Sequence, residues 1–221
     1  MSIAVDRTLQ ETGLDLHLGV LSYPVTRDPA TELLADAIHE AARQRRQELM
    51  GEAAESDPVI AAVREAFKAV GQDPDRIRPS SERLTRLVLA GKPLPRATPA
   101  QDVASAVSLL TGIPVGAYDR AALKGDLRLR FGLAGERHDV ESASHALEDM
   151  ILLADDLGPL GGPYGDAPRA EVKTETRDVL LVLYGLNMDV TLVEAAAELT
   201  DMLMMRCAAD VQRMDQEDMG A

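Results

Sequence analysis

The sequence predicts one folded domain in which an opening strand and four helices are followed by short strands and a last helix. Its 221 residues, 46% of them hydrophobic, suffice for one sizeable core. Apolar residues recur with helical spacing over much of residues 28–111, and short alternating or continuous apolar runs follow beyond residue 114. We find no internal repeat and no domain boundary, so we expect a single domain over residues 1–221.

The first strand is expected at residues 14–20, where leucine and valine alternate with other residues, and it should end near the Tyr23-Pro24 turn. Four helices are expected next, each with a capping residue at its start and a glycine after its last turn. The starts are marked by Asp28-Pro29, Asp57-Pro58, Ser80 or Ser81, and a Thr98/Gln101 capping box. The four helices are expected at residues 28–50, 57–70, 80–90 and 98–111.

The second half of the chain favours short strands, which we expect at residues 115–118, 127–131, 150–153 and 179–184. Residues 157–169 (LGPLGGPYGDAPR) hold too much glycine and proline for the interior of an element. They predict a long ordered loop of a kind that often lines a site. A helix is expected at residues 192–205, and residues 209–221 are expected to be a frayed tail.

The overall charge limits the possible partners. With 23 Lys and Arg against 37 Asp and Glu, the formal charge is −14, which is the wrong sign for a dedicated binder of nucleic acid or of an anionic membrane. The single cysteine excludes an internal disulfide framework and a cysteine-rich zinc site. We find no membrane segment and no targeting signal, so we expect a cytoplasmic protein.

The motifs of several enzyme classes are missing. No two of the four histidines have the spacing that places zinc ligands on one helix face, so no metal site is expected. There is no GxSxG, P-loop or GxGxxG motif, and no cofactor is expected. The run from His138 to Glu141 lacks the CxxC of a deaminase and is interpreted as a polar strand edge.

Residues 76–96 are strongly basic within this acidic chain. They contain six basic residues and one acidic residue, Glu82. One interpretation is a binding patch for phosphate or carboxylate, with the helix start near Ser80 adding backbone donors. The other is a solvated face whose arginines pair with acidic residues of the last helix, such as Asp201. In that helix Met202, Met204 and Met205 indicate either core packing or a dimer contact, so a homodimer is possible.

Several segments occur in the order and spacing of one known domain. They are Arg78-Pro79-Ser80-Ser81-Glu82, residues 89–94 (LAGKPL), residues 102–119 (DVASAVSLLTGIPVGAYD), residues 127–130 (LRLR) and Gly135-Glu136. In these residues the chain resembles the B3/B4 editing domain of the phenylalanyl-tRNA synthetase β-subunit, and most closely its stand-alone homologues. The resemblance runs from about Leu14 to Ala208, and residues 102–119 are its most specific part.

The resemblance implies an α+β fold with a central, mostly antiparallel sheet flanked by helices, and a core over about residues 14–208. It also implies a pocket between the helix that holds Asp102, the strand after Pro114 and the loop near Gly161 and Gly162. In the synthetase this pocket accepts a mischarged tyrosyl group on the tRNA 3′ end and hydrolyses its ester. Nothing in this chain resembles the adenylation motifs of the synthetase, so the chain is not expected to be one.

The chain departs from the editing domain at the positions that carry its specificity. Ser105 replaces an asparagine, and Ala104 replaces the threonine before it. Gly116 replaces a histidine, and Val182 replaces the glutamate that senses the tyrosine hydroxyl. Stand-alone relatives have Asp-Ser-x-Arg-Thr-x-Val-Thr-x-x-Thr where residues 166–176 keep only the Asp, Arg, Val and last Thr. An apolar residue in place of a hydrogen-bonding partner removes most of the discrimination for a phenol.

The sequence therefore leads to a set of pocket candidates and leaves the catalytic residues open. The candidates are Arg78, Ser80, Ser81, Arg86, Asp102, Ser105, Gly116, Tyr118, Asp119, Gly161, Gly162, Thr176 and Val182. The leading hypothesis is a protein that binds an aminoacyl-tRNA 3′ end or an amino-acid-like ligand and acts, if it is an enzyme, as an aminoacyl-ester hydrolase. The alternatives are a non-catalytic binding or regulatory module and a metabolic enzyme that reuses the pocket.

Overall fold

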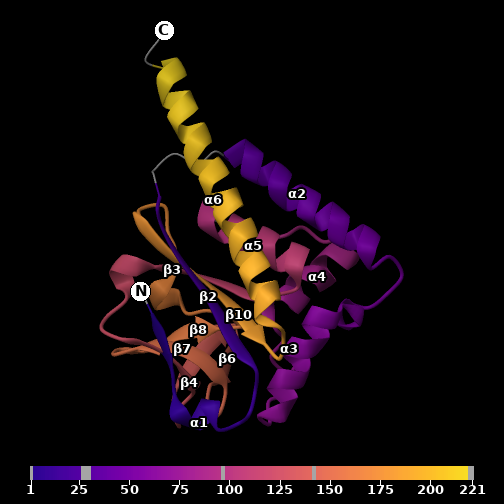
Figure 1. Cartoon of the computed structure of the whole chain (residues 1–221), viewed down its shortest axis with the longest axis vertical. Coiled ribbons are helices and arrows are strands. Elements are labelled where there is room, and N and C mark those ends of the chain that lie inside the picture. The colour runs from indigo at the N-terminus through magenta and orange to yellow at the C-terminus, as the bar shows by residue number, and fades with distance from the viewer. Residues whose placement is uncertain (1, 26–30, 96–97, 141–142, 219–221) are drawn as a thin grey trace.

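The computed structural model describes residues 2–25, 31–95, 98–140 and 143–218. Helices α2 to α5 lie together on one side of the strands, and α6 crosses the sheet that holds β2 and β10 (Figure 1). The helices are α1 (Arg7–Gln10), α2 (Thr31–Glu48), α3 (Pro58–Ala69), α4 (Ser80–Leu89), α5 (Pro99–Thr111) and α6 (Val190–Asp218). Short 3-10 helices occupy Ala54–Ser56, Arg120–Ala122 and Pro168–Ala170.

The strands form two main sheets and one hairpin. The five-stranded sheet has the order β1 (Ile3–Val5), β4 (Leu127–Phe131), β7 (Ile151–Asp155), β8 (Gly158–Gly162) and β9 (Gly165–Asp166). The three-stranded sheet has the order β2 (Leu16–Pro24), β10 (Asp178–Leu186) and β3 (Val115–Asp119), and β5 (Arg137–Val140) pairs with β6 (Ala143–Ala146). Only the β1–β4 pair is parallel among these described strands.

The expected α+β class, with mostly antiparallel strands flanked by helices, is confirmed. The strands are divided between two sheets, and β3 of one is bonded to β9 of the other through a side chain. The backbone N–H of Ala117 in β3 donates to Oδ2 of Asp166 in β9 over 3.1 Å. A side chain thus takes the donor that a backbone ladder would use, and β3 and β9 remain in separate sheets.

Most of the expected elements and caps are confirmed. Asp57 caps α3 by accepting from the N–H groups of Val59 and Ile60, and Thr98 and Gln101 form the capping box of α5. The expected start at Asp28-Pro29 lies outside the described residues. The last helix continues to Asp218, which includes much of the stretch expected to be frayed. Residues 219–221 of that stretch also lie outside the described part.

Two expectations are wrong. Neither Ser80 nor Ser81 caps α4: Pro79 is at the cap without a side-chain bond, and the N–H of Ser80 donates to the carbonyl of Pro163 over 2.8 Å. Residues 157–169 are not a loop, because they contain β8 and β9. The glycines allow close strand packing there, since a Cβ at Gly161 would lie 2.5 Å from the carbonyl oxygen of Gly165.

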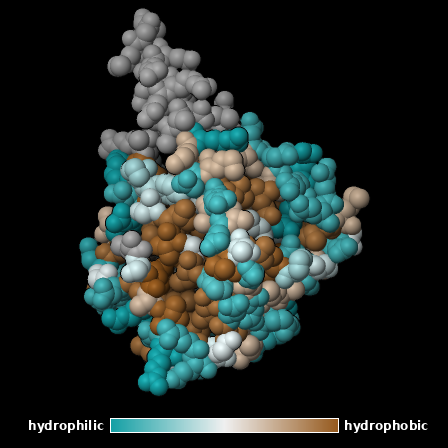
Figure 2. All heavy atoms as spheres, in the orientation of Figure 1, coloured by the Kyte–Doolittle hydropathy of each residue, from teal (hydrophilic) through white to brown (hydrophobic). Residues whose placement is uncertain are grey.

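Asp201 of the last helix does not pair with the basic stretch as the second interpretation required, and the side chains of α6 beyond residue 206 lie outside the described part. Asp201 instead accepts from the hydroxyl of Tyr23 over 3.0 Å. Met204 is buried in the core, which confirms core packing for that residue, whereas Met202 and Met205 are exposed. Figure 2 shows further apolar residues in the middle of the face over which α6 and β2 lie. No helix in the described ranges has the length and apolar character needed to cross a bilayer.

Candidate functional site

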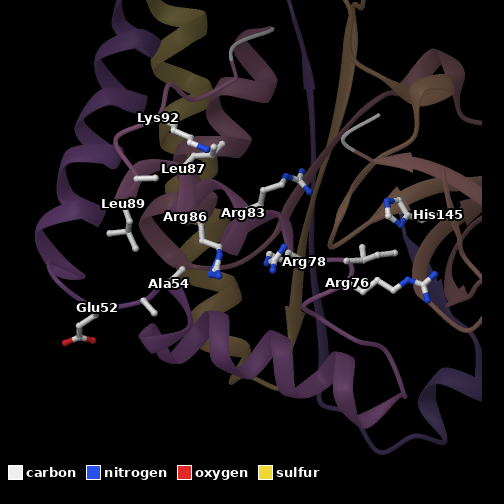
Figure 3. A pocket seen from close by; sticks show the side chains of 13 residues that line it. Glu52, Ala54, Arg76, Arg78, Arg83, Arg86, Leu87, Leu89, Lys92 and His145 are labelled. Carbon is white, nitrogen blue, oxygen red and sulfur yellow. The ribbon is translucent and has the colours of Figure 1, made fainter. Parts of the chain in front are cut away.

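Two of the hollows beside α4 share one residue, Arg83. The larger, which we call the outer groove, has a volume of about 690 Å³. Figure 3 shows its side chains, which come from α4, the segments on either side of it, the loop after α2, and β6. The smaller, which we call the inner cavity, has a volume of about 180 Å³ and lies between α4, α5, β3 and β9. The sharing of Arg83 makes the two hollows neighbours.

Five cationic side chains line the outer groove, together with His145 and one carboxylate, that of Glu52. The five are Arg76, Arg78, Arg83, Arg86 and Lys92. This confirms that the basic stretch gathers on one surface, although Arg96 lies outside the described residues. A local excess of cations of this kind attracts ligands with several negative charges.

A buried carboxylate fixes part of this cationic surface. The side chain of Glu82 is fully buried and accepts from Arg64 over 2.8 Å. Its other oxygen lies 3.6 Å from Nε of Arg78 and 3.7 Å from Nε of Arg86. Glu82 therefore lies within ion-pair distance of two guanidinium groups at the edge of the groove, and Nη1 of Arg86 also lies 3.5 Å from Oε2 of Glu55.

The inner cavity combines small residues with a few polar groups. Its polar side chains are Ser80, Arg83, Gln101, Ser105, Ser108 and Asp166. Nη1 of Arg83 donates to the carbonyl of Tyr164 over 2.9 Å. This bond, with the bond from Ser80 to Pro163, ties the start of α4 to the β8–β9 hairpin and so places Arg83 and Asp166 on one cavity.

Asp166 is the most unusual titratable group of the inner cavity. Burial raises the pKa of its carboxyl to about 7, while the hydrogen bond from Ala117 and the charge of Arg83 oppose that rise. Oδ1 is shielded from solvent and faces the Tyr118 hydroxyl outside the geometry of a direct hydrogen bond. A carboxyl of this kind changes its charge near neutral pH, which is typical of functional sites.

Two buried tyrosines lie behind Asp166. The hydroxyls of Tyr118 and Tyr184 are 2.6 Å apart, and burial raises the pKa of both well above the ordinary value. Gly116 makes room for this arrangement. A Cβ at Gly116 would lie 2.5 Å from the Tyr118 hydroxyl and 2.8 Å from Oδ1 of Asp166. The side chains of Tyr118 and Asp166 thus fill the space beside the position where the editing domain has histidine.

The candidates from the sequence fall into three places. Arg78 and Arg86 line the outer groove, whereas Ser80 and Ser105 line the inner cavity. The others line neither hollow. Gly116, Tyr118 and Val182 are buried behind the inner cavity, Gly161 and Gly162 pack within β8, and Ser81 and Asp102 are buried in α4 and α5. Asp119 accepts from Thr176 over 2.9 Å and caps the Arg120–Ala122 turn, away from both hollows.

Sequence reasoning did not select Arg83, Gln101, Ser108, Asp166 or Tyr184 as pocket residues. Arg83 was visible in the basic stretch, and Asp166 was visible as a residue shared with the stand-alone relatives. Neither signal showed that the two side chains line one cavity. No group of three or more His, Cys, Asp or Glu residues in the described part of the chain is placed to hold a metal ion.

Comparisons with known proteins show the family to which the chain belongs. The family model of the B3/4 domain matches residues 62–209, which is more than half of the chain. The chain belongs to this family. It is 35% identical over 102 residues to the phenylalanine–tRNA ligase beta subunit of Mycolicibacterium paratuberculosis and 36% identical over 121 residues to that of Nocardia farcinica.

These matches cover 43% and 52% of this chain but only 12% and 14% of the two ligase subunits. This B3/4 domain protein therefore corresponds to a small part of its curated relatives. A crystal structure of an N-terminal fragment of the phenylalanyl-tRNA synthetase beta-subunit from Pyrococcus horikoshii is 15% identical to it, with a TM-score of 0.42. That match covers 49% of this chain and 40% of the fragment.

The packing at Gly116 leads to a first prediction. Gly116→Ala is expected to destabilise the protein by about 1–3 kcal/mol, because the added methyl group would overlap the Tyr118 hydroxyl and Asp166. Urea unfolding measures this change. Gly19→Ala in β2 is the matched control, since its nearest atoms would be 3.2 Å away. An equal or larger loss in the control would contradict the close packing described around Gly116.

Proposed function

We propose that this B3/4 domain protein binds the 3′ end of an aminoacyl-tRNA and hydrolyses the ester that joins the amino acid to the ribose. The observation that carries the proposal is that Arg83 lines both hollows. A ligand with phosphates in the outer groove can then place a small head group in the inner cavity. Family membership supports this choice of ligand, because the related ligase beta subunits act with tRNA according to their names.

The sizes and charges of the hollows suit the two parts of such a ligand. At about 30 Å³ per water molecule, the inner cavity holds roughly six waters, which is room for an aminoacyl group and too little for a nucleotide. The outer groove is several times larger and carries the cations. Arginine side chains are well suited to phosphate oxygens because they donate two parallel hydrogen bonds.

A free amino acid or a similar zwitterion is the second candidate. Arg83 and Asp166 present opposite charges to the inner cavity, and an amino acid carries one group for each of them. Such a ligand would leave the outer groove unused. Binding of tRNA therefore distinguishes the two candidates.

Salt dependence tests the proposed contact with tRNA. We expect weak binding with a slope of log K against log salt of roughly −2 to −4, because a few of the five cations would meet phosphates and the rest of the protein is acidic. Arg86→Ala should weaken binding and make the slope shallower by about 1. The control is Arg7→Ala, which removes an exposed arginine from α1. Nanomolar affinity at physiological salt with a slope near −8, or equal effects of the two variants, would contradict the proposed groove.

A further inference from the structure

We propose that Asp166 is the general base that activates water for hydrolysis of the aminoacyl ester, an inference that rests on the proposed function. Asp166 carries the only carboxylate that lines the inner cavity among the described residues. Arg83 lines the same cavity and supplies a positive charge. Ester hydrolysis needs an acceptor for the proton of water and a positive group for the oxygen that becomes charged.

The carboxyl group of Asp166 is held in a fixed orientation. Oδ2 accepts the N–H of Ala117 from the neighbouring strand over 3.1 Å. Oδ1 is packed beside Tyr118, at the point where any side chain at residue 116 would clash. Water therefore has to approach Oδ2, which keeps a second lone pair for it. A base held in this way loses little orientational freedom in the reaction.

The step balances without any further reactant. Oδ2 takes one proton from a water molecule while the water oxygen bonds to the ester carbonyl carbon. The carbonyl oxygen gains negative charge, which the guanidinium of Arg83 stabilises. The tetrahedral intermediate collapses with cleavage of the bond between that carbon and the ribose oxygen. Asp166 then returns its proton to the ribose oxygen, and the products are a free amino acid and a tRNA with a free hydroxyl.

Asp166 could act as a general base, or it could only bind the α-ammonium group of the aminoacyl ligand. Its surroundings favour the role of base. The charged or titratable groups that face it are Arg83 from α4, Tyr118 from β3, Tyr184 from β10, Tyr164 and Glu171. Burial keeps the pKa of the carboxyl near neutrality, so the group can both accept and return a proton. An acid that is partly protonated at neutral pH is a weaker partner for a cation than an ordinary aspartate.

The test uses the full chain with tRNAs that carry radiolabelled alanine, serine or tyrosine, and with non-hydrolysable amide-linked analogues for binding. For the ester that is cleaved fastest, Asp166→Asn should lower the rate by about 100-fold or more and leave binding of the analogue within about 3-fold. The rate of the unsubstituted protein should rise with pH to a plateau above about pH 7, and Asp166→Asn should lose that dependence. Asp126→Asn, which removes an exposed carboxylate, is the control.

A second variant separates chemistry from folding. Asp166→Ala should show a similar loss of rate, and added formate should restore part of that rate, because formate can occupy the space left by the carboxyl group and accept the proton. Rescue of this kind is not expected for a carboxyl group that only supports the fold. Thermal unfolding of each variant verifies that it is folded at the assay temperature.

The outcomes distinguish this inference from the proposed function. Full activity of Asp166→Asn would overturn the role of Asp166 and leave the proposed function intact. Binding of the amide analogues without cleavage of any of the three esters would overturn that role together with the hydrolysis in the proposed function, and would leave tRNA binding intact. A large loss of binding in Asp166→Asn with an unchanged pH profile would make Asp166 a ligand for the ammonium group and also overturn its role as base. Failure of the unsubstituted protein to bind the analogues would reject the proposed function itself.

Discussion

Asp57→Ala is expected to lower the free energy of unfolding by about 3–5 kcal/mol, because it removes the nearer of two carboxylates from a buried arginine. Nη1 of Arg45 donates to Asp57 over 2.5 Å, and the Arg45 side chain is only 3% exposed. Arg45 also donates to the carbonyl of Leu109 in α5. Asp57 further accepts from the N–H groups of Val59 and Ile60 at 2.9 Å each. One carboxylate thus joins α2 to α3 and caps α3.

Urea unfolding of Asp57→Ala and Asp57→Asn would separate the contribution of the ion pair with Arg45 from that of the N-cap of α3. Asparagine is as good an N-cap as aspartate, so Asp57→Asn should keep about 1 kcal/mol that Asp57→Ala loses. Asp126→Ala, at an exposed aspartate, should change stability by less than about 0.5 kcal/mol. A loss below 1 kcal/mol in Asp57→Ala would show that Arg45 finds other partners and that the pair does not organise the helices.

The stability of the protein is expected to fall as the pH rises from about 4 to about 7, through Asp166. Burial raises the pKa of this carboxyl from 3.8 to about 7, so the folded protein binds a proton in that range that the unfolded chain has released. The resulting stabilisation is complete below pH 3.8 and is lost as the pH rises through 7. At 1.36 kcal/mol per pKa unit its upper limit is about 4 kcal/mol. Water in the inner cavity would make this stabilisation smaller, because Asp166 is partly exposed there.

The difference between the unsubstituted protein and Asp166→Asn isolates this effect from that of other titrating groups. The stability of Asp166→Asn relative to the unsubstituted protein should increase between pH 4 and pH 8, since the amide cannot ionise. Asp126→Asn, at an exposed aspartate, is the control. A trend of the opposite sign would mean that the folded state favours the carboxylate, as ordinary ion-paired aspartates do. Destabilisation by ionised Asp166 near neutral pH is the expected cost of keeping a base in a buried site.

Local signals along the chain predicted the elements that depend on local interactions. The caps at Asp57 and Thr98 were predictable because each satisfies N–H groups a few residues ahead. Gly112 was predictable as the end of α5, where φ is +76°. The density of arginine in residues 76–96 also predicted a cationic surface, because Glu82 is the one acidic residue among six basic residues in that stretch.

Contacts between distant segments decided the rest. The pairing of β8 with β9 has no local signal, since glycine and proline ordinarily indicate a loop. These glycines are needed only because another segment of backbone lies against them. Ser80 resembles a cap in the sequence, yet the carbonyl of Pro163 takes its N–H.

The inner cavity likewise exists only in the tertiary structure. The sequence alone determined the helices with strong caps, the basic stretch and the resemblance to the B3/B4 domain. It could not show that Asp166 and Arg83 line one cavity, because they are 83 positions apart in the chain and the hairpin bonds at Pro163 and Tyr164 bring them together. Nor could it show that burial changes the pKa of one aspartate among many, since burial is a property of the packed structure.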